Sequence, residues 1–366
     1  MSSPTNFDIV SIQVGAVHED LMGGFLRVFE DLNLRTLVIL NEKINHLRGS
    51  FFDTVNNYPN SQVSFHGFRG VPEWDRVTDR IRQANPRLIF SNTLQLSGPA
   101  EMADKLKLPT IGVVHNPRKF TASPECMALA QSGQLDLVGL APHVKTAIEA
   151  AVPNMAGRVH AHFPYEWTPD NYTPKRDYGP VRKICIPGAI NYNNRDYAGL
   201  VDYLATADFS DTDPFEIHIL TGGRDLGRLK DDIASRNIGK YFVFADLEPG
   251  FEQIPHATYL RRLYDCDVCL ALLPKNAEHY LTFKITTGIM AAIGMGMPII
   301  APRRVGEVYG FTAIETPEGK GHDFAAADMS PQRLRLLGDQ AIQRKAEGLK
   351  MNREILEPVL HRILGA

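Results

Sequence analysis

The chain of 366 residues lacks any apolar run near the roughly 20 residues that cross a bilayer as a helix. Its first residues do not combine a basic region with an apolar core, so we expect no signal peptide. Neither charge sign dominates, because 39 Lys and Arg residues are balanced by 42 Asp and Glu residues. We therefore expect no nucleic-acid partner. These absences favour a cytoplasmic protein, with peripheral contact at the inner membrane face left open.

Cysteine is also scarce, with four residues: Cys126, Cys185, Cys266 and Cys269. This low content is typical of a reducing compartment. The last two match C-x-x-C, but no second pair or suitably spaced histidine accompanies them, which is weak support for a metal. They lie in the apolar stretch D-C-D-V-C-L-A-L-L. We predict buried core cysteines.

The length exceeds one typical core, which predicts two domains. Strand-like and helix-like segments alternate in both halves, without N-G or D-G hairpin signals. This pattern predicts an α/β protein with two doubly wound parallel sheets and a ligand cleft between them. The predicted parts are an N-terminal domain (1–165), a proline-rich linker (166–180), a C-terminal domain (181–345) and a last helix (346–366).

The strands expected in the first half are residues 7–14, 34–40, 87–90, 110–114, 135–140 and 158–163. Those expected in the second half are residues 183–186, 216–220, 241–244, 268–273 and 299–301. Residues 41–64 are expected to be irregular after a short helix. Two helices, 332–345 and 352–364, are expected at the end of the chain.

One stretch combines several features of an anion site. Residues 278–302 read E-H-Y-L-T-F-K-I-T-T-G-I-M-A-A-I-G-M-G-M-P-I-I-A-P. We interpret them as a loop, a buried helix capped by Thr286 or Thr287, a turn and a strand. A helix N-terminus, two hydroxyls and the ammonium of Lys284 suit a phosphate or diphosphate. The alternative is an ordinary buried helix with a threonine cap and a solvated lysine.

Two positions in the first half follow predicted strands. Gly15 comes after the first strand and would permit close backbone approach to a ligand, although G-x-G-x-x-G is absent. His115 follows the strand 110–114, at the carboxyl end where open α/β sheets bind ligands. It could act on a substrate hydroxyl or hold the substrate. The alternatives are a plain loop for Gly15 and His18, and a histidine satisfied by backbone groups for His115.

The order of motifs in residues 181–311 resembles a known family. A strand ends in Gly188 and is followed by Arg195-Asp196-Tyr197. The segments H-I-L-T-G-G-R-D-L-G, Y-F-V-F-A-D-L-E, L-Y-D-C-D-V-C-L-A-L-L and G-M-G-M-P-I-I-A-P come next, and Glu307 follows. This order resembles the retaining GT-B glycosyltransferases, in particular the GT4-like family. The chain departs from that family at Ala291, where a glutamate usually holds the donor ribose.

The resemblance implies two Rossmann-like domains, with a nucleotide sugar such as a UDP or GDP sugar bound by the second. It implies that the last helix crosses back to the first domain. It also implies no metal and no cofactor, because protein cations neutralise the diphosphate. The residues it assigns to catalysis are His115, Lys284 and Arg195. The residues it assigns to donor binding are Gly15, Gly188, Glu278, Thr286, Thr287 and Glu307, with Glu278 or Glu307 replacing the lost glutamate.

We therefore expect a hexosyltransferase that moves a sugar to a glycan, lipid-linked or small-molecule acceptor with retention of configuration. One alternative is a catalytically degenerate GT-B protein that binds a nucleotide, glycan or partner, which Ala291 favours. Another is a sugar-nucleotide epimerase, which would need paired carboxylates that do not stand out here. The D-x-D sequence at Asp211 and Asp213 is interpreted as a turn.

Overall fold

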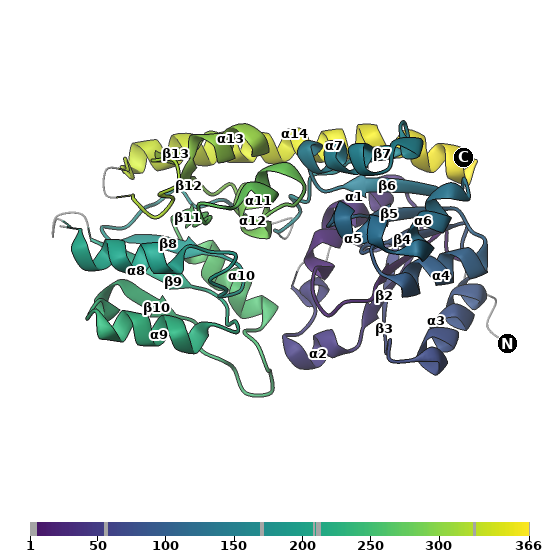
Figure 1. Cartoon of the computed structure of the whole chain (residues 1–366), viewed down its shortest axis with the longest axis horizontal. Helices are drawn as coiled ribbons and strands as arrows, with labels where there is room; N and C mark the ends of the chain where they lie inside the picture. Colours follow the sequence, from purple (N-terminus) through teal and green to yellow (C-terminus); the bar gives the residue numbers. More distant parts are fainter. Residues whose placement is uncertain are drawn as a thin grey trace. The chain divides into compact units, whose positions relative to one another are not determined.

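The computed structural model describes residues 6–54, 58–168, 172–207, 209, 214–324 and 327–365, so the D-x-D sequence at Asp211 and Asp213 lies outside the described residues. The chain forms two compact units (Figure 1). The first unit comprises Met1–Glu166, Thr282–Ile285 and Gly348–Ala366, and the second comprises Trp167–Leu281 and Thr286–Glu347. Each unit contains one parallel sheet.

The sheet of the first unit has seven parallel strands in the order β3-β2-β1-β4-β5-β6-β7. The strand order reverses beside β1, which lies between β2 and β4. In open α/β sheets this reversal leaves a crevice at the carboxyl ends of the two strands. The strands are β1 (Ile9–Gln13), β2 (Thr36–Asn41), β3 (Ser61–His66), β4 (Leu88–Ser91), β5 (Thr110–Val113), β6 (Leu135–Gly139) and β7 (Val159–Ala161).

Helices connect these strands and bury their apolar faces. In α1, for example, Phe25, Leu26 and Phe29 are buried. The elements are η1 (Glu19–Met22), α1 (Gly23–Asp31), α2 (Lys43–Leu47), η2 (Phe51–Asp53), α3 (Val71–Ala84), α4 (Ser97–Leu106), α5 (Pro117–Ala122), α6 (Pro124–Gln131), α7 (Pro142–Ala151) and η3 (Pro153–Met155).

Strand β3 corrects the expectation that residues 41–64 are irregular. Its sequence, S-Q-V-S-F-H, has no apolar run, because β3 is an edge strand with no fully buried residue. Its backbone nevertheless pairs with β2 over six residue pairs. An edge strand is set by backbone pairing more than by burial, so hydrophobic periodicity misses it.

The sheet of the second unit has six parallel strands in the order β10-β9-β8-β11-β12-β13. It repeats the reversal, with β8 between β9 and β11. All four cysteines are free and buried, which confirms the prediction for Cys266 and Cys269. The strands are β8 (Arg182–Ile186), β9 (Phe215–Ile219), β10 (Phe242–Phe244), β11 (Val268–Leu270), β12 (Ile299–Pro302) and β13 (Ile314–Thr316).

The helices of the second unit follow the same alternation with its strands. They are α8 (Tyr197–Thr206), α9 (Leu226–Ser235), η4 (Gly239–Tyr241), α10 (His256–Asp265), α11 (Glu278–Thr282), α12 (Thr287–Gly294) and α13 (Arg303–Tyr309). The α12 helix is buried at seven of its eight residues, from Gly288 to Gly294. The expectation of a buried helix after Lys284 is confirmed.

The chain ends in one helix of 34 residues, α14 (Pro331–Leu364), so the prediction of two helices is wrong. The helix continues through Gly348, where a Cβ would lie 2.6 Å from the Tyr165 ring. Glycine serves close packing here and does not end the helix. From Gly348 onward the helix belongs to the first unit, where the Asn352 side chain exchanges hydrogen bonds of 2.7 and 2.8 Å with the backbone of Phe163.

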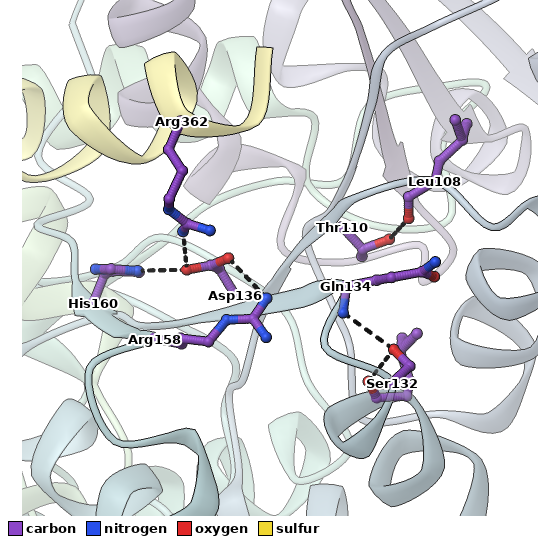
Figure 2. Close-up of polar contacts among 9 residues, drawn as sticks. Leu108, Thr110, Ser132, Gln134, Asp136, Arg158, His160 and Arg362 are labelled. Atoms are coloured by element: carbon purple, nitrogen blue, oxygen red, sulfur yellow. Dashed lines mark hydrogen bonds and ion pairs between the residues drawn. The ribbon is translucent and has the colours of Figure 1, made fainter. Parts of the chain in front are cut away.

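A buried carboxylate holds the end of α14 in the first unit (Figure 2). Asp136 on β6 accepts hydrogen bonds from Arg362 at 2.7 Å, His160 at 3.0 Å and Arg158 at 3.2 Å. Burial alone would raise the pKa of Asp136. The hydrogen bonds from His160 and Arg362 and the two arginine charges outweigh burial and lower this pKa to about 2.

Candidate functional site

The turn after β8 lies close to the start of α12 in the second unit. Gly188 in this turn has a φ of 92°, in the left-handed region that favours glycine, and a Cβ there would lie 3.1 Å from Arg195 Nη2. A Cβ on Gly288, in the first turn of α12, would lie 2.6 Å from Pro187 Cγ. Thr221 donates a 2.7 Å hydrogen bond to the Gly188 carbonyl and fixes the turn. The two glycines therefore permit the close approach of the turn to the helix N-terminus.

Arg195 is buried between these two segments, with 6% of its surface exposed. Its guanidinium donates to the carbonyl oxygens of Asn194 and Pro187 and, at 3.1 Å, to Thr286 Oγ1. Its Nε is buried and has no hydrogen-bond partner among the described residues. All three acceptors are neutral, and burying a cation without an anion costs free energy. The arrangement is therefore suited to an anionic ligand.

Thr286 occupies the N-cap position of α12, but its hydroxyl does not cap the helix. The hydroxyl accepts from Arg195 instead, and the Thr286 N–H donates to Tyr309 Oη at 3.1 Å. The prediction that Thr286 or Thr287 is the N-cap residue is confirmed for the position of Thr286, although its hydroxyl contacts Arg195 and not the helix backbone. Thr287 is the first residue of the helix. The partial positive charge of a helix N-terminus adds to that of Arg195.

Glu278 and Glu307, predicted to replace the glutamate that the family has at the position of Ala291, lie beside arginines other than Arg195. Glu278 is exposed and forms two hydrogen bonds with Arg304, at 2.5 and 3.0 Å. Glu307 lines a cavity of about 540 Å³ that Arg303 and Arg344 also line, beside the edge strand β13. Ala291 itself is fully buried within α12. A ribose-binding role for Glu278 or Glu307 thus stays a prediction that no contact within the unit supports.

In the first unit, side chains at the carboxyl ends of β1, β4 and β5 form an amide network. Gln13 donates to the carbonyl oxygens of Gly15 at 3.1 Å and Val17 at 2.6 Å. Asn92 donates to Gln13 Oε1 at 2.7 Å and to the His18 carbonyl at 2.8 Å. A Cβ on Gly15 would lie 3.1 Å from Gln13 Nε2, so glycine here accommodates that amide. The network fixes the loop that carries His18.

His115 joins this network in a defined tautomer. Its Nε2 lies 2.7 Å from the Asn92 carbonyl oxygen, which can only accept, so Nε2 carries the proton. Nδ1 of the neutral ring then has the free lone pair. The ring stacks on His18 with centroids 4.9 Å apart. Burial, followed by the His18 charge, lowers the pKa of His115 to about 3, and burial, followed by Arg48, lowers that of His18 to about 4.

Sequence reasoning selected His115 and Gly15 but missed Gln13 and Asn92 and treated His18 as loop. A polar residue ends β1 and another directly follows β4, and the sheet places β1, β4 and β5 side by side. This recurrence of polar residues at strand ends could have identified Gln13 and Asn92. His18 also has a left-handed φ of 76°, which is uncommon for a residue with a side chain. The structure thus assigns five residues to one strand-end site: Gln13, Gly15, His18, Asn92 and His115.

Lys284 belongs to the first unit, with the segment Thr282–Ile285, whereas Arg195 and Thr286 belong to the second. His143 Nε2 donates to the Lys284 carbonyl at 2.8 Å. Partial burial, then the charges of Lys119 and Arg118, lower the pKa of Lys284. Within its own unit, Lys284 is thus part of a basic cluster.

The described residues contain no group of three or more His, Cys, Asp or Glu side chains that could hold a metal ion. His160 and His162, two residues apart in the sequence, have separate surroundings. His160 contacts Asp136, and His162 stacks on Phe25 with centroids 3.5 Å apart. No helix in the described ranges is long and apolar enough to cross a membrane.

No family model and no curated protein matches the chain. Solved structures match it over almost its whole length. The Anabaena protein HepE in complex with UDP-glucose matches with a TM-score of 0.65 and 13% identity, over 97% of this chain and 99% of that chain. A glycosyltransferase from Rickettsia africae matches with a TM-score of 0.60 and 12% identity, over 98% and 99% of the two chains. The chain has the GT-B fold.

The predicted fold class is therefore confirmed. A putative UDP-N-acetylglucosamine 2-epimerase from Listeria monocytogenes also matches, with a TM-score of 0.60 and 13% identity over 99% of this chain and 98% of that chain. Proteins described as a glycosyltransferase and as an epimerase thus share this fold. The fold does not set the activity, which depends on the residues of the two sites.

Proposed function

We propose that the protein is a glycosyltransferase that takes a hexose from a nucleoside-diphosphate donor and passes it to an acceptor hydroxyl. The observation that carries this proposal is Arg195, a buried guanidinium that donates only to neutral oxygens. A donor diphosphate would supply the anion at the turn after β8 and the N-terminus of α12. The UDP-glucose in the complex of the neighbour HepE supports a nucleotide sugar as the donor class.

Charge develops on the leaving diphosphate as the bond to the sugar breaks. Arg195 and the start of α12 would bind the departing diphosphate more strongly than the intact donor, which lowers the barrier. A charged hydrogen bond of this kind contributes about 1.5–3 kcal/mol. We propose Lys284 as a second cation for the diphosphate, and Gly188 and Thr287 as backbone contacts. With these cations, we expect transfer without a metal or cofactor.

His115, which belongs to the first unit, would act as a hydrogen-bond acceptor. Its Nδ1 lone pair suits a hydroxyl of the acceptor or of the transferred sugar. A group with a pKa of about 3 is a poor general base near neutral pH. The acceptor proton would instead pass to the departing phosphate oxygen. That proton transfer requires the acceptor oxygen to attack the sugar from the same face that the diphosphate leaves. Attack from this face retains the configuration of the sugar, as proposed for a GT4-like enzyme.

The test is a screen of UDP and GDP sugars by calorimetry, followed by product analysis. A donor at about 100 times its Kd should stabilise the protein by about 2.7 kcal/mol through mass action. Arg195→Gln should weaken donor binding at least about tenfold. Arg236→Gln, an exposed change in the same unit, is the control. Equal donor affinity in wild type and Arg195→Gln would contradict the proposal.

Two other functions have specific support and give different products. The buried Ala291 favours a catalytically degenerate protein, which would bind the donor but release neither nucleotide nor glycosylated acceptor. The Listeria neighbour favours an epimerase, which would convert the donor sugar to its epimer without an acceptor. Chromatography of the nucleotide and sugar products therefore separates the three functions.

A further inference from the structure

Three cations lie close together in the first unit, and two of them lie over one aromatic ring. Arg118 and Lys119 belong to α5, and Lys284 comes from the segment Thr282–Ile285. The guanidinium of Arg118 lies 4.5 Å from the centroid of the Phe283 ring, and Lys284 Nζ lies 5.8 Å from the same centroid. We call Arg118, Lys119 and Lys284 the basic cluster.

Hydrogen bonds and packing fix the backbone that carries the basic cluster. Asn116 caps α5 by accepting from the Arg118 N–H at 3.1 Å, and Phe120 of the same helix is fully buried. His143 holds the Lys284 carbonyl at 2.8 Å. The cations are therefore positioned by packing and by backbone hydrogen bonds.

Neither Arg118 nor Lys119 forms an ion pair within the described part of the chain. The cations also affect one another, since the pKa of Lys284 is lowered by burial and then by Lys119 and Arg118. Like charges held close together raise the free energy of the folded state. A bound anion would offset this repulsion.

We propose that Arg118 and Lys119 bind an acidic group of the acceptor, a phosphate or a carboxylate, so that the acceptor is an anionic glycan or glycoconjugate. This inference rests on the proposed function and names the acceptor class. A guanidinium fork matches the two oxygens of either group, and a lysine adds a mobile point charge.

The position of the pair favours the acceptor over the donor. Arg118 follows His115 by three residues, and three residues span at most about 11 Å. His115 is the residue proposed to accept a hydroxyl, so one short connection carries contacts for both the hydroxyl and the acid. Of the residues proposed for the donor diphosphate, Arg195 belongs to the second unit, and Lys284 is the one member of the basic cluster given to the donor, which leaves Arg118 and Lys119 for the acceptor. A neutral acceptor would give Arg118 and Lys119 no binding partner.

The experiment compares three probes on the full chain by calorimetry at low salt: methyl glucoside, its 6-phosphate and methyl glucuronide. The variant is Arg118→Gln/Lys119→Gln. The control is Arg69→Gln/Arg76→Gln, which removes the same charge from two exposed arginines of the first unit. The wild type should bind at least one acidic probe at least about tenfold more tightly than the neutral one, and raising the salt should weaken that binding. The phosphate and glucuronide arms show which acid is bound.

The double variant should lose this preference, and the control should keep it. Without ligand, the double variant should unfold at the same temperature as the wild type or higher, because repulsion is removed. A retained preference for the acidic probe would overturn the proposal. The proposal would also be overturned if the double variant lost as much affinity for UDP as for the acidic probe, because Arg118 and Lys119 would then bind the donor. If the double variant does not fold, Lys119→Gln alone should weaken acidic-probe binding at least threefold, and unchanged binding would overturn the proposal. Failure of donor binding itself appears separately, in the nucleotide titration of the wild type.

Discussion

The two sheets share a topology but place opposite chemistry at their carboxyl ends. Each sheet reverses its strand order beside its first strand, β1 in one and β8 in the other. At the carboxyl ends of β1, β4 and β5 stand amides and two histidines that burial keeps neutral, and after β8 stands a buried arginine that contacts only neutral oxygens. The first site is suited to hydroxyls and the second to an anion. One backbone arrangement can therefore serve either half of a transfer reaction, and the side chains decide which.

The largest effect should follow from removing the cation after β8. Arg195→Gln should lower the transfer rate by about 10²–10³, the range found when one donor that stabilises developing charge is lost. The free energy of unfolding without ligand should not fall, because an unpaired buried cation has been replaced by a neutral amide. Transfer assays and urea unfolding measure the two quantities. A transfer rate within twofold of wild type would contradict the anion-binding role of Arg195, and with it the chemical difference between the two sites.

Lys284→Ala should have the next largest effect and lower the transfer rate at least about tenfold. The variant should stay folded, because its backbone is held through the carbonyl that His143 contacts. A Lys107→Ala variant, which removes an exposed lysine of the same unit, is the control. If Lys284→Ala changes neither rate nor donor affinity, the diphosphate role of Lys284 is wrong.

His115→Ala should lower turnover about tenfold and leave donor affinity nearly unchanged, because it removes a contact on the first-unit side only. The wild-type rate should show no inflection from His115 or His18 between about pH 5.5 and pH 8, since both pKa values lie below this window. Single-turnover rates at saturating donor provide the measurement. An inflection near pH 6.5 that disappears in His115→Ala would show that His115 titrates normally.

The sign of the stability effect follows from the same pKa values. A histidine whose folded pKa lies below its unfolded value of 6.5 is neutral in the folded state and protonates more readily when unfolded. A buried neutral histidine therefore leaves the free energy of unfolding unchanged above about pH 6.5. It lowers this free energy as the pH falls from about 6.5 toward about 3–4. His115→Ala should reduce this loss of stability in acid.

The sequence predicted the two parallel sheets because most strands are apolar or alternating segments that follow a helical pattern. It missed β3, whose residues are set by pairing with β2, and the short edge strand β13, whose sequence is I-E-T. It also divided α14 near Gly348, which serves the packing of Tyr165. Arg195 and His115 could be selected because each lies directly in a strand-to-helix connection. The partners Gln13 and Asn92 could not, since their contact joins residues 79 apart in the chain. Only the folded sheet brings such residues together.

The smallest expected effect is that of Arg362→Gln, which removes a cation that is paired with a carboxylate. Asp136 pairs with Arg158, His160 and Arg362, and the Arg362 side chain is 55% exposed. Because solvent screens an exposed partner, Arg362→Gln should cost about 1 kcal/mol or less near neutral pH. It should leave donor affinity and transfer unchanged. This outcome would contrast with Arg195→Gln, which should lose activity and keep stability.

The pH dependence of the Arg362→Gln effect identifies its cause. The pKa of Asp136 is lowered from 3.8 to about 2, so its ionised pairs stabilise the fold above about pH 3.8 and are lost as the pH falls toward about 2. The stability difference between wild type and Arg362→Gln should therefore be constant from about pH 7 to pH 5 and shrink below about pH 3.8. Urea unfolding across this range measures it, with Arg353→Gln, an exposed change on the same helix, as the control. A difference that persists undiminished at about pH 2.5 would show that Arg362 stabilises α14 through its packing and not through the Asp136 carboxylate.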